Sequence, residues 1–199
     1  MLLLALLFTP AVLAADAKIL VFGDSLAAAY GLNNPQQGWV ALLAQRLKEK
    51  YPHAQVINAS ISGETTRGGL SRIDAELARH RPTLVILELG ANDGLRGLPV
   101  AQAHANLAGV IRAIRKSNAA VILIGLQIPP NYGIEYAREF RDMYPRLASQ
   151  YKVALVPFLL DGFAEQRDLF QTDGLHPVAA AQVHILENVW PKVNAAMKP

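Results

Sequence analysis

The sequence predicts an α/β domain in which helices cover both faces of a five-stranded parallel sheet, giving a three-layer αβα sandwich. Short, nearly continuous apolar runs alternate along the chain with longer segments whose apolar residues recur at helical spacing. Strands without a polar face must be covered on both sides, which is the situation of strands in parallel sheets. With 199 residues, of which 52% are hydrophobic, the chain is long enough to bury such a core.

Strands and helices are expected to alternate in order. Strands are predicted at residues 18–22, 55–59, 83–89, 121–126 and 154–158. Helices are predicted at residues 38–50, 69–80, 100–116, 134–150 and 178–197. Gly23 and Gly90 stop the first and third strands, and Pro82 ends the second helix. Because neither a repeat nor a linker interrupts this pattern, we expect residues 16–199 to form one domain with the flavodoxin-like strand order 2-1-3-4-5.

The composition restricts the available chemistry to oxygen and nitrogen groups. The chain has no cysteine, which excludes disulfides, a thiolate nucleophile and a cysteine-bound metal. Its formal net charge is +3, but the basic residues are scattered, and the densest run, residues 45–50, is typical of a solvated helix face. Nucleic acid is therefore not an expected partner. Four histidines lack a partner at metal-ligand spacing and are assigned no role: His53, His80, His104 and His184.

The N-terminus has the pattern of a secretory signal peptide. Residues 2–13 form an apolar run, and Ala14 and Ala15 provide the small side chains that suit a signal peptidase. We expect residues 1–15 to be a signal peptide, cleaved after Ala14 or Ala15, that directs the protein to the periplasm. No Lys or Arg precedes the run, which leaves a first buried helix or strand as the alternative. The run is too short for an integral membrane anchor.

Four polar clusters follow the predicted strands. In an open parallel sheet, ligands bind beyond the carboxyl ends of the strands, next to the point where the winding direction reverses. The clusters are Gly23-Asp24-Ser25-Leu26, Ser62-Gly63-Glu64, Gly90-Ala91-Asn92-Asp93 and Asp173-Gly174-Leu175-His176. We therefore expect a single site at this edge of the sheet, built from all four loops.

Ser25, His176 and Asp173 are the residue types of a hydrolytic catalytic triad. A serine hydroxyl becomes an effective nucleophile when a base lies within hydrogen-bond reach and a third group orients that base. Asp173, three residues before His176, can accept the Nδ1 proton of the imidazole and leave Nε2 facing Ser25. Candidate oxyanion donors are the backbone N–H groups of Ser25, at a strand-to-helix turn, and of Gly63, together with the side-chain amide of Asn92.

These four blocks, in this order, resemble those of the GDSL or SGNH hydrolase family, and the resemblance extends over residues 19–177. It implies that Ser25 is the nucleophile and that His176 and Asp173 are its base and acid. It also implies an oxyanion hole formed by Ser25, Gly63 and Asn92. By the same resemblance, no cofactor and no metal is required.

The resemblance further implies a substrate class. Relatives hydrolyse carboxylic esters and thioesters of acyl chains through an acyl-serine intermediate, as arylesterases, thioesterases and lysophospholipases. An acyl pocket needs an apolar wall, and the segment 126–133 after the fourth predicted strand is placed to supply it, with Ile128 and Pro129 as predicted substrate-binding residues. Because no segment demands a partner chain, we expect a monomer.

Two other functions remain open at this point. A carbohydrate deacetylase on the same scaffold would act on acetylated sugars and not on long acyl chains. A non-catalytic flavodoxin-like binding protein would use the same sheet, although residues 23–31 lack the hydroxyl and glycine run that would wrap a phosphate. Asp24 and Asp93 flank the candidate catalytic residues, and we expect both to hydrogen-bond backbone amides of their loops.

Overall fold

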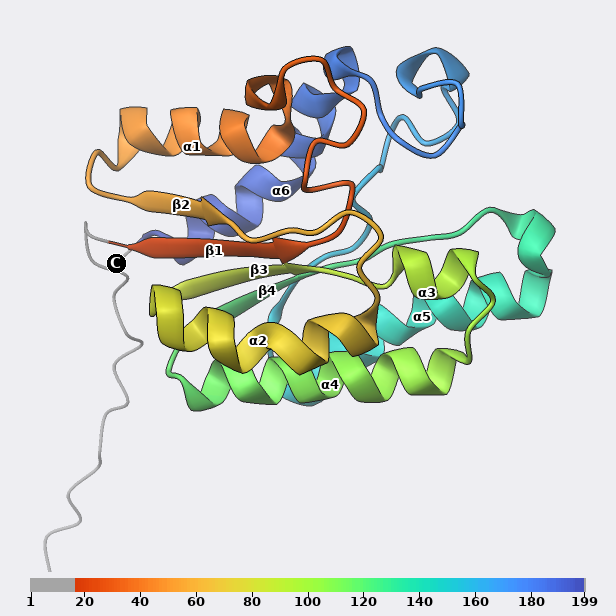
Figure 1. Ribbon diagram of the computed structural model, residues 1–199, viewed down its shortest axis with the longest axis horizontal. Coiled ribbons are helices and arrows are strands. Elements are labelled where there is room, and N and C mark those ends of the chain that lie inside the picture. Colours follow the sequence, from red (N-terminus) through yellow and green to blue (C-terminus); the bar gives the residue numbers. More distant parts are fainter. Residues whose placement is uncertain (1–16, 199) are drawn as a thin grey trace, which may run out of the picture.

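Five parallel strands form one sheet in the order β2-β1-β3-β4-β5, which confirms the predicted fold class and strand order (Figure 1). The computed structural model describes residues 17–198, so the predicted signal peptide lies outside the described residues. The strands are β1 (Lys18–Gly23), β2 (Gln55–Asn58), β3 (Leu84–Glu88), β4 (Ala120–Ile124) and β5 (Ala154–Val156).

Helices cover both faces of this sheet, as Figure 1 shows. On one face, α1 (Trp39–Lys50) packs against α6 (Gln182–Ala196). On the other face, α4 (Val100–Lys116) packs between α2 (Thr66–His80) and α5 (Ile134–Tyr151). None of the helices between residues 17 and 198 combines the length and apolar character needed to cross a membrane.

The hydrophobic core fills the space between the sheet and the two helical layers. β3 is buried along its whole length, and in β1 only Lys18 is exposed. Large helix side chains, among them Trp39 and Phe140, are fully buried in this core. Each such side chain contributes roughly 1.5–3 kcal/mol by leaving water. Because both faces of the central strands are covered, their sequences show continuous apolar runs and no alternation.

Two local structures at the carboxyl ends of the strands differ from the predictions. Ser25 is not at a strand-to-helix turn, because a bend at Asp24 and successive turns at residues 25–31 follow β1. Ala29 and Gly31 have φ angles of 58° and 73°, a left-handed conformation that cannot continue a right-handed helix. After β3 comes a short helix, α3 (Ala91–Leu95), which the sequence analysis missed because five residues show no periodicity.

Two helices begin three or more residues away from their predicted starts. α2 begins at Thr66 because the Thr65 side chain accepts a hydrogen bond from the Gly68 amide at 3.2 Å and so caps the helix. α6 begins at Gln182, after a separate 3-10 turn at Ala179–Ala181. Neither difference changes the layers or the position of the loops at the carboxyl ends of the strands.

Candidate active site

The turn that holds Ser25 starts where β1 pairs with β3. Gly23, the last residue of β1, lies beside Glu88, the last residue of β3. A Cβ at Gly23 would lie 2.5 Å from Oε2 and 2.9 Å from the carbonyl oxygen of Glu88, so only glycine fits there. Beyond Gly23 the chain turns back, and the Tyr30 amide donates to the Ser25 carbonyl oxygen at 3.2 Å. Ser25 is thereby lifted to the end of the sheet, where it is half-buried.

Ser25, His176 and Asp173 form a continuous chain of hydrogen bonds. The Ser25 Oγ lies 2.9 Å from His176 Nε2, although the two residues are 151 positions apart. The His176 Nδ1 lies 2.7 Å from Asp173 Oδ2. Because an ionised Asp173 can only accept, Nδ1 donates to it and Nε2 is left to accept from the Ser25 hydroxyl. The structure therefore brings together the three residues that the sequence placed in one triad.

The Asp173 carboxylate is held in its ionised form. Its Oδ1 accepts hydrogen bonds from the backbone amides of Leu175 at 2.9 Å and His176 at 3.0 Å. Partial burial acts to raise the pKa of Asp173, but the hydrogen bonds from the His176 side chain and from these amides outweigh it and lower the pKa to about 2. A permanently charged Asp173 can orient the imidazole and stabilise the imidazolium that forms during proton transfer.

The loop before α6 that contains Asp173 and His176 is fixed by side chains that bind its backbone. The Arg167 guanidinium donates to the carbonyl oxygens of Phe170, Gln171 and Thr172 at distances from 2.6 to 3.1 Å. The Gln171 side chain donates to the Tyr30 carbonyl oxygen at 2.9 Å, which ties this loop to the turn after Ser25. The Tyr30 ring also lies 4.6 Å from the His176 ring, measured between centroids.

Gly63 lies in the loop after β2 with its peptide groups held in place. Its φ angle is +80°, which a residue with a side chain rarely adopts. The Arg96 guanidinium donates to the Gly63 carbonyl oxygen at 3.1 Å, and the following Glu64 pairs with Arg72 of α2 at 2.7 Å. The Ile61 amide donates to the Gly23 carbonyl oxygen at 3.0 Å and so joins this loop to the Ser25 turn.

Asn92 lies in the short helix α3 and reaches back toward the Ser25 turn. Its side-chain Nδ2 donates to Asp24 Oδ2 at 3.2 Å. Asp24 directly precedes Ser25, so the amide of Asn92 is fixed beside the candidate nucleophile. The three candidate oxyanion donors, Ser25, Gly63 and Asn92, thus lie in the segments that follow β1, β2 and β3.

The order of these four loops identifies the family. Residues 21–183 match the model of the GDSL-like lipase/acylhydrolase family, which spans every loop described above. The chain belongs to this family.

Relatives of this GDSL-like protein are named as hydrolases. Esterase TesA of Pseudomonas aeruginosa is 51% identical over 178 residues, which cover 89% of this chain and 88% of TesA. Thioesterase 1/protease 1/lysophospholipase L1 of Escherichia coli is 38% identical over 174 residues, covering 87% and 82% of the two chains. A crystal structure of TesA superposes with a TM-score of 0.87 at 49% identity, covering 90% of this chain and 99% of that one.

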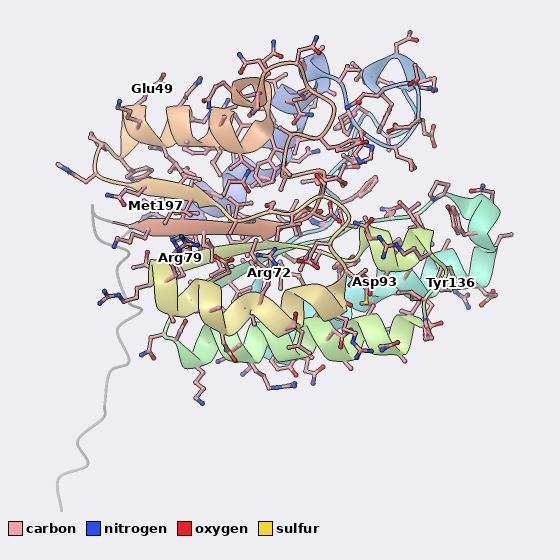
Figure 2. All side chains as sticks on the ribbon, in the orientation of Figure 1. Glu49, Arg72, Arg79, Asp93, Tyr136 and Met197 are labelled. Atoms are coloured by element: carbon pink, nitrogen blue, oxygen red, sulfur yellow. The ribbon has the colours of Figure 1, made fainter. Side chains whose placement is uncertain are left out.

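Three buried acids surround the site of this GDSL-like protein, and sequence reasoning missed one of them. Asp24 accepts from the Leu26 amide of its own loop at 3.1 Å, as expected, whereas Asp93 accepts at 2.8 Å from the amide of Thr66, the first residue of α2, and not from its own loop. Figure 2 shows Asp93 at the N-terminal end of α2. Glu88 was overlooked because it lies inside an apolar strand. The sequence did contain one indication of a special role, because Glu88 is the only charged residue in the predicted strand 83–89.

The two residues predicted to line an acyl pocket differ in exposure. Ile128 is buried and packs beside α3, where a Cβ at Gly94 would lie 2.6 Å from its Cγ2. Pro129 is exposed. Because α3 also contains Asn92, the Ile128–Pro129 segment borders the candidate oxyanion hole.

Two of the remaining histidines contact residues outside the triad. His80 faces Glu76 on α2 at 3.2 Å, and the His184 ring lies 5.6 Å from the Phe163 ring. Within residues 17–198, no group of three or more potential ligands is arranged to hold a metal ion.

Proposed function

We propose that this protein is a serine esterase that hydrolyses carboxylic esters and thioesters of acyl chains through an acyl-Ser25 intermediate. The observation that supports this most strongly is the hydrogen-bonded chain from Ser25 Oγ through His176 to Asp173. Membership of the GDSL-like lipase/acylhydrolase family agrees with the same reaction class. In this proposal Ser25 is the nucleophile, His176 the general base and acid, and Asp173 the residue that orients His176.

The first half of the reaction forms the acyl-enzyme. His176 Nε2 takes the hydroxyl proton of Ser25 while Oγ attacks the acyl carbon, and Asp173 stabilises the resulting imidazolium. The carbonyl oxygen becomes an oxyanion that accepts hydrogen bonds from the backbone N–H groups of Ser25 and Gly63 and from the amide of Asn92. The intermediate collapses when the bond to the leaving group breaks, and His176 gives its proton to the departing alcohol or thiol.

The second half releases the acid. A water molecule attacks the acyl carbon of acyl-Ser25, and His176 accepts its proton. The same three donors hold the second oxyanion. When this intermediate collapses, Ser25 Oγ leaves, takes the proton back from His176, and the carboxylic acid departs. No step consumes a cofactor, and every proton that His176 accepts it returns.

The substrates that we propose are small amphiphilic esters and thioesters. The Escherichia coli relative is named a thioesterase and a lysophospholipase, and the Pseudomonas aeruginosa relative an esterase. The position of Ile128 next to α3 suits Ile128 and the adjoining Pro129 to contact the acyl chain just beyond the reacting carbon.

We also propose that the protein is exported to the periplasm through a cleaved signal peptide at residues 1–15, and that residues 16–199 act as a monomeric single domain. The apolar run at residues 2–13, followed by Ala14 and Ala15, supports export. N-terminal sequencing of protein recovered from the periplasm tests the cleavage, and sedimentation equilibrium tests the monomer. An intact N-terminus or a stable dimer would contradict the respective proposal.

The test is a series of initial rates on p-nitrophenyl esters from acetate to palmitate. We expect rates that increase with acyl length, that are lost in Ser25→Ala, and that are unchanged in Ser71→Ala, whose exposed hydroxyl bonds only its own helix. Substantial activity in Ser25→Ala would refute the mechanism. Hydrolysis of acetate alone, together with acetylated sugars, would favour the carbohydrate deacetylase.

An Ile128→Gly variant in the same series tests the acyl pocket. It should change the ratio of long-chain to short-chain rates, and an unchanged ratio would show that Ile128 does not line the pocket.

A further inference from the structure

Carboxyl side chains lie behind the candidate oxyanion hole in an environment where charges are costly. Asp24, Glu88 and Asp93 are 0%, 0% and 3% exposed. Within residues 17–198, no Lys, Arg or His forms an ion pair with any of them. Asp93 uses both of its oxygens to bind the amide and hydroxyl of Thr66. Asp24 and Glu88 lack such a purely structural explanation.

Asp24 is placed to orient Asn92. Its two oxygens accept separate hydrogen bonds, Oδ1 from the Leu26 amide at 3.1 Å and Oδ2 from Asn92 Nδ2 at 3.2 Å. A carboxylate is suited to accept on both sides, whereas an amide would present its NH2 group to one of the two donors. The bond to Asp24 occupies one N–H of the Asn92 amide and fixes the direction of the other.

Glu88 is placed to remain uncharged beside Asp24. Its Oε2 accepts from the Asp24 amide at 3.2 Å, and its buried Oε1 has no hydrogen-bond partner in the described part of the chain. Burial, followed by the charge of Asp24, raises the pKa of Glu88 well above its ordinary value. Burial also raises the pKa of Asp24, to about 6, against the hydrogen bonds from Leu26 and Asn92.

The other titratable groups around this pair do not neutralise it. Asp93 of α3 adds a further negative charge that raises the pKa of Asp24, and His176 acts in the opposite direction. Tyr144 of α5 is fully buried nearby, but its hydroxyl donates to the Leu89 carbonyl oxygen at 3.1 Å. Two adjacent carboxyl groups in such a site retain a proton between them.

We propose that Asp24 and Glu88 are a pair of positioning residues in which Asp24 is ionised and holds the Asn92 amide toward the oxyanion, while Glu88 keeps its proton. This inference rests on the proposed function, because the oxyanion that Asn92 would stabilise is the one formed in acyl transfer to Ser25. The single charge on Asp24 suffices to orient Asn92. A second charge on Glu88 would oppose the negative charge that develops on the substrate oxygen, so the proton on Glu88 supports catalysis.

The first test is a double-mutant cycle between Asp24 and Asn92, measured as kcat and KM on one p-nitrophenyl ester. Asn92→Ala should lower kcat by about 10²–10³-fold, the usual effect of losing one oxyanion donor. Asp24→Asn should lower kcat at least tenfold with KM unchanged, and by less than twofold when Asn92 is already Ala. An equal loss in both backgrounds would overturn the positioning role, because a merely structural Asp24 would cost the same in each.

The second test concerns the proton on Glu88. Glu88→Ala should lower kcat, and Glu88→Gln, which imitates the neutral acid, should restore most of it at neutral pH. The kcat of the wild type should fall as the pH rises through the pKa of Glu88, and this decline should be absent in Glu88→Gln. Equal damage from Gln and Ala would overturn the assignment of the proton. The control is Glu49→Gln, on the exposed face of α1 (Figure 2), which should leave the pH profile unchanged.

Each rate should be divided by the number of active sites, counted from the burst of p-nitrophenol, so that misfolded protein does not count as slow enzyme. If Glu88→Ala does not fold, the proton on Glu88 is still tested by comparing the pH profiles of the wild type and Glu88→Gln. The positioning role of Asp24 is still tested by the double-mutant cycle with Asn92. A fully active Ser25→Ala would overturn the proposed function and the inference with it. An inactive Ser25→Ala with an additive cycle would overturn the inference alone.

Discussion

The turn that carries Ser25 is built into the core, whereas the loop that carries Asp173 and His176 lies at the surface. Gly23 is buried between the strand ends, and Asp24 is fully enclosed. In contrast, Asp173 is exposed, and Arg167 holds its loop through three backbone carbonyl oxygens, those of Gln171 and Thr172 in exposed hydrogen bonds. One half of the candidate triad therefore depends on packing, and the other on a few directed hydrogen bonds.

This difference separates stability from catalysis within a single site. A substitution in the buried half disturbs the sheet and the catalytic geometry together, because the same atoms serve both. A substitution in the exposed half can remove catalytic geometry while the core remains intact, since water replaces the lost hydrogen bonds at little cost. Variants of the two halves should consequently differ in the ratio of lost activity to lost stability.

Asp173→Asn tests the exposed half and should have the largest effect. An amide at this position favours the wrong imidazole tautomer, and neutralising the acid of a Ser–His–Asp triad lowers kcat by about 10⁴-fold. Steady-state kinetics on a p-nitrophenyl ester measures the loss. If kcat falls less than tenfold, Asp173 does not orient His176.

The same variant should change stability only over a defined range of pH. The pKa of Asp173 is lowered from 3.8 to about 2 in the folded protein, so its charge stabilises the fold above pH 4, and this contribution is lost as the pH falls toward 2. The effect is small because the side chain is 39% exposed. Thermal melts should show a slightly higher Tm for the wild type at pH 7 and equal values near pH 2. A difference in Tm between the wild type and Asp173→Asn that persists at pH 2 would show that it does not come from the charge of Asp173.

Gly23→Ala tests the buried half and should lower stability and activity together. The new Cβ would lie 2.5 Å and 2.9 Å from two Glu88 oxygens, one of them a backbone atom that cannot move alone. Overpacking of this kind costs about 1–3 kcal/mol, and the displaced Ser25 turn should lower kcat as well. Urea unfolding and kinetics on the same preparation give both values.

Gly109→Ala is the matched control for this substitution. It lies inside α4, its Cβ would meet only the movable end of the Leu70 side chain, and alanine favours a helix by about 1 kcal/mol over glycine. We expect unchanged kcat and equal or higher stability. Should Gly23→Ala behave like this control, the close approach of the Ser25 turn to β3 would have no consequence for the fold.

Arg167→Ala should have the smallest effect, and on activity alone. Loss of the guanidinium frees the carbonyl oxygens of Phe170, Gln171 and Thr172, which water can then solvate. The loosened loop should lower kcat roughly tenfold with little change in Tm, because a base displaced by a fraction of an ångström reacts more slowly. Arg138→Ala, which removes only an exposed pair with Glu135, serves as the control. Equal rates for the two variants would show that Arg167 does not fix the loop.

The order of strands and helices could be predicted because each main element is long enough to show a clear pattern of apolar residues. Segments such as residues 83–89 and 100–116 contain enough apolar positions for their period to be unambiguous. The turns after β1 and helix α3 could not be predicted, because five to eight residues rich in Ala, Asn, Asp and Gly show no period. Their shape is imposed by contacts with other loops, such as Gln171 with Tyr30.

The residues of the candidate site could be predicted from the sequence, but the hydrogen bonds and packing contacts between them could not. Ser25, Gly63, Asn92, Asp173 and His176 each follow a strand, so the topology alone directs them to one edge. Glu88 is part of the strand pattern, and nothing in a linear sequence shows that its oxygen faces the amide of Asp24. The direction of Ile128 was equally hidden, since it depends on the space that Gly94 leaves in a helix 34 residues earlier in the chain.

The surface loop closes on itself, because Phe170 and Pro177 form an antiparallel bridge and the Gln171 amide donates to the His176 carbonyl oxygen at 2.8 Å. Asp173 and His176 therefore lie on one closed loop, so that a displacement of this loop carries the acid and the base together. The contact between Ser25 Oγ and His176 Nε2 is then the triad contact that joins two separate loops. Adaptation of such an enzyme to another temperature needs no change to Asp173 and His176. It needs changes only to the residues that hold their loop in place, such as Arg167 and Gln171.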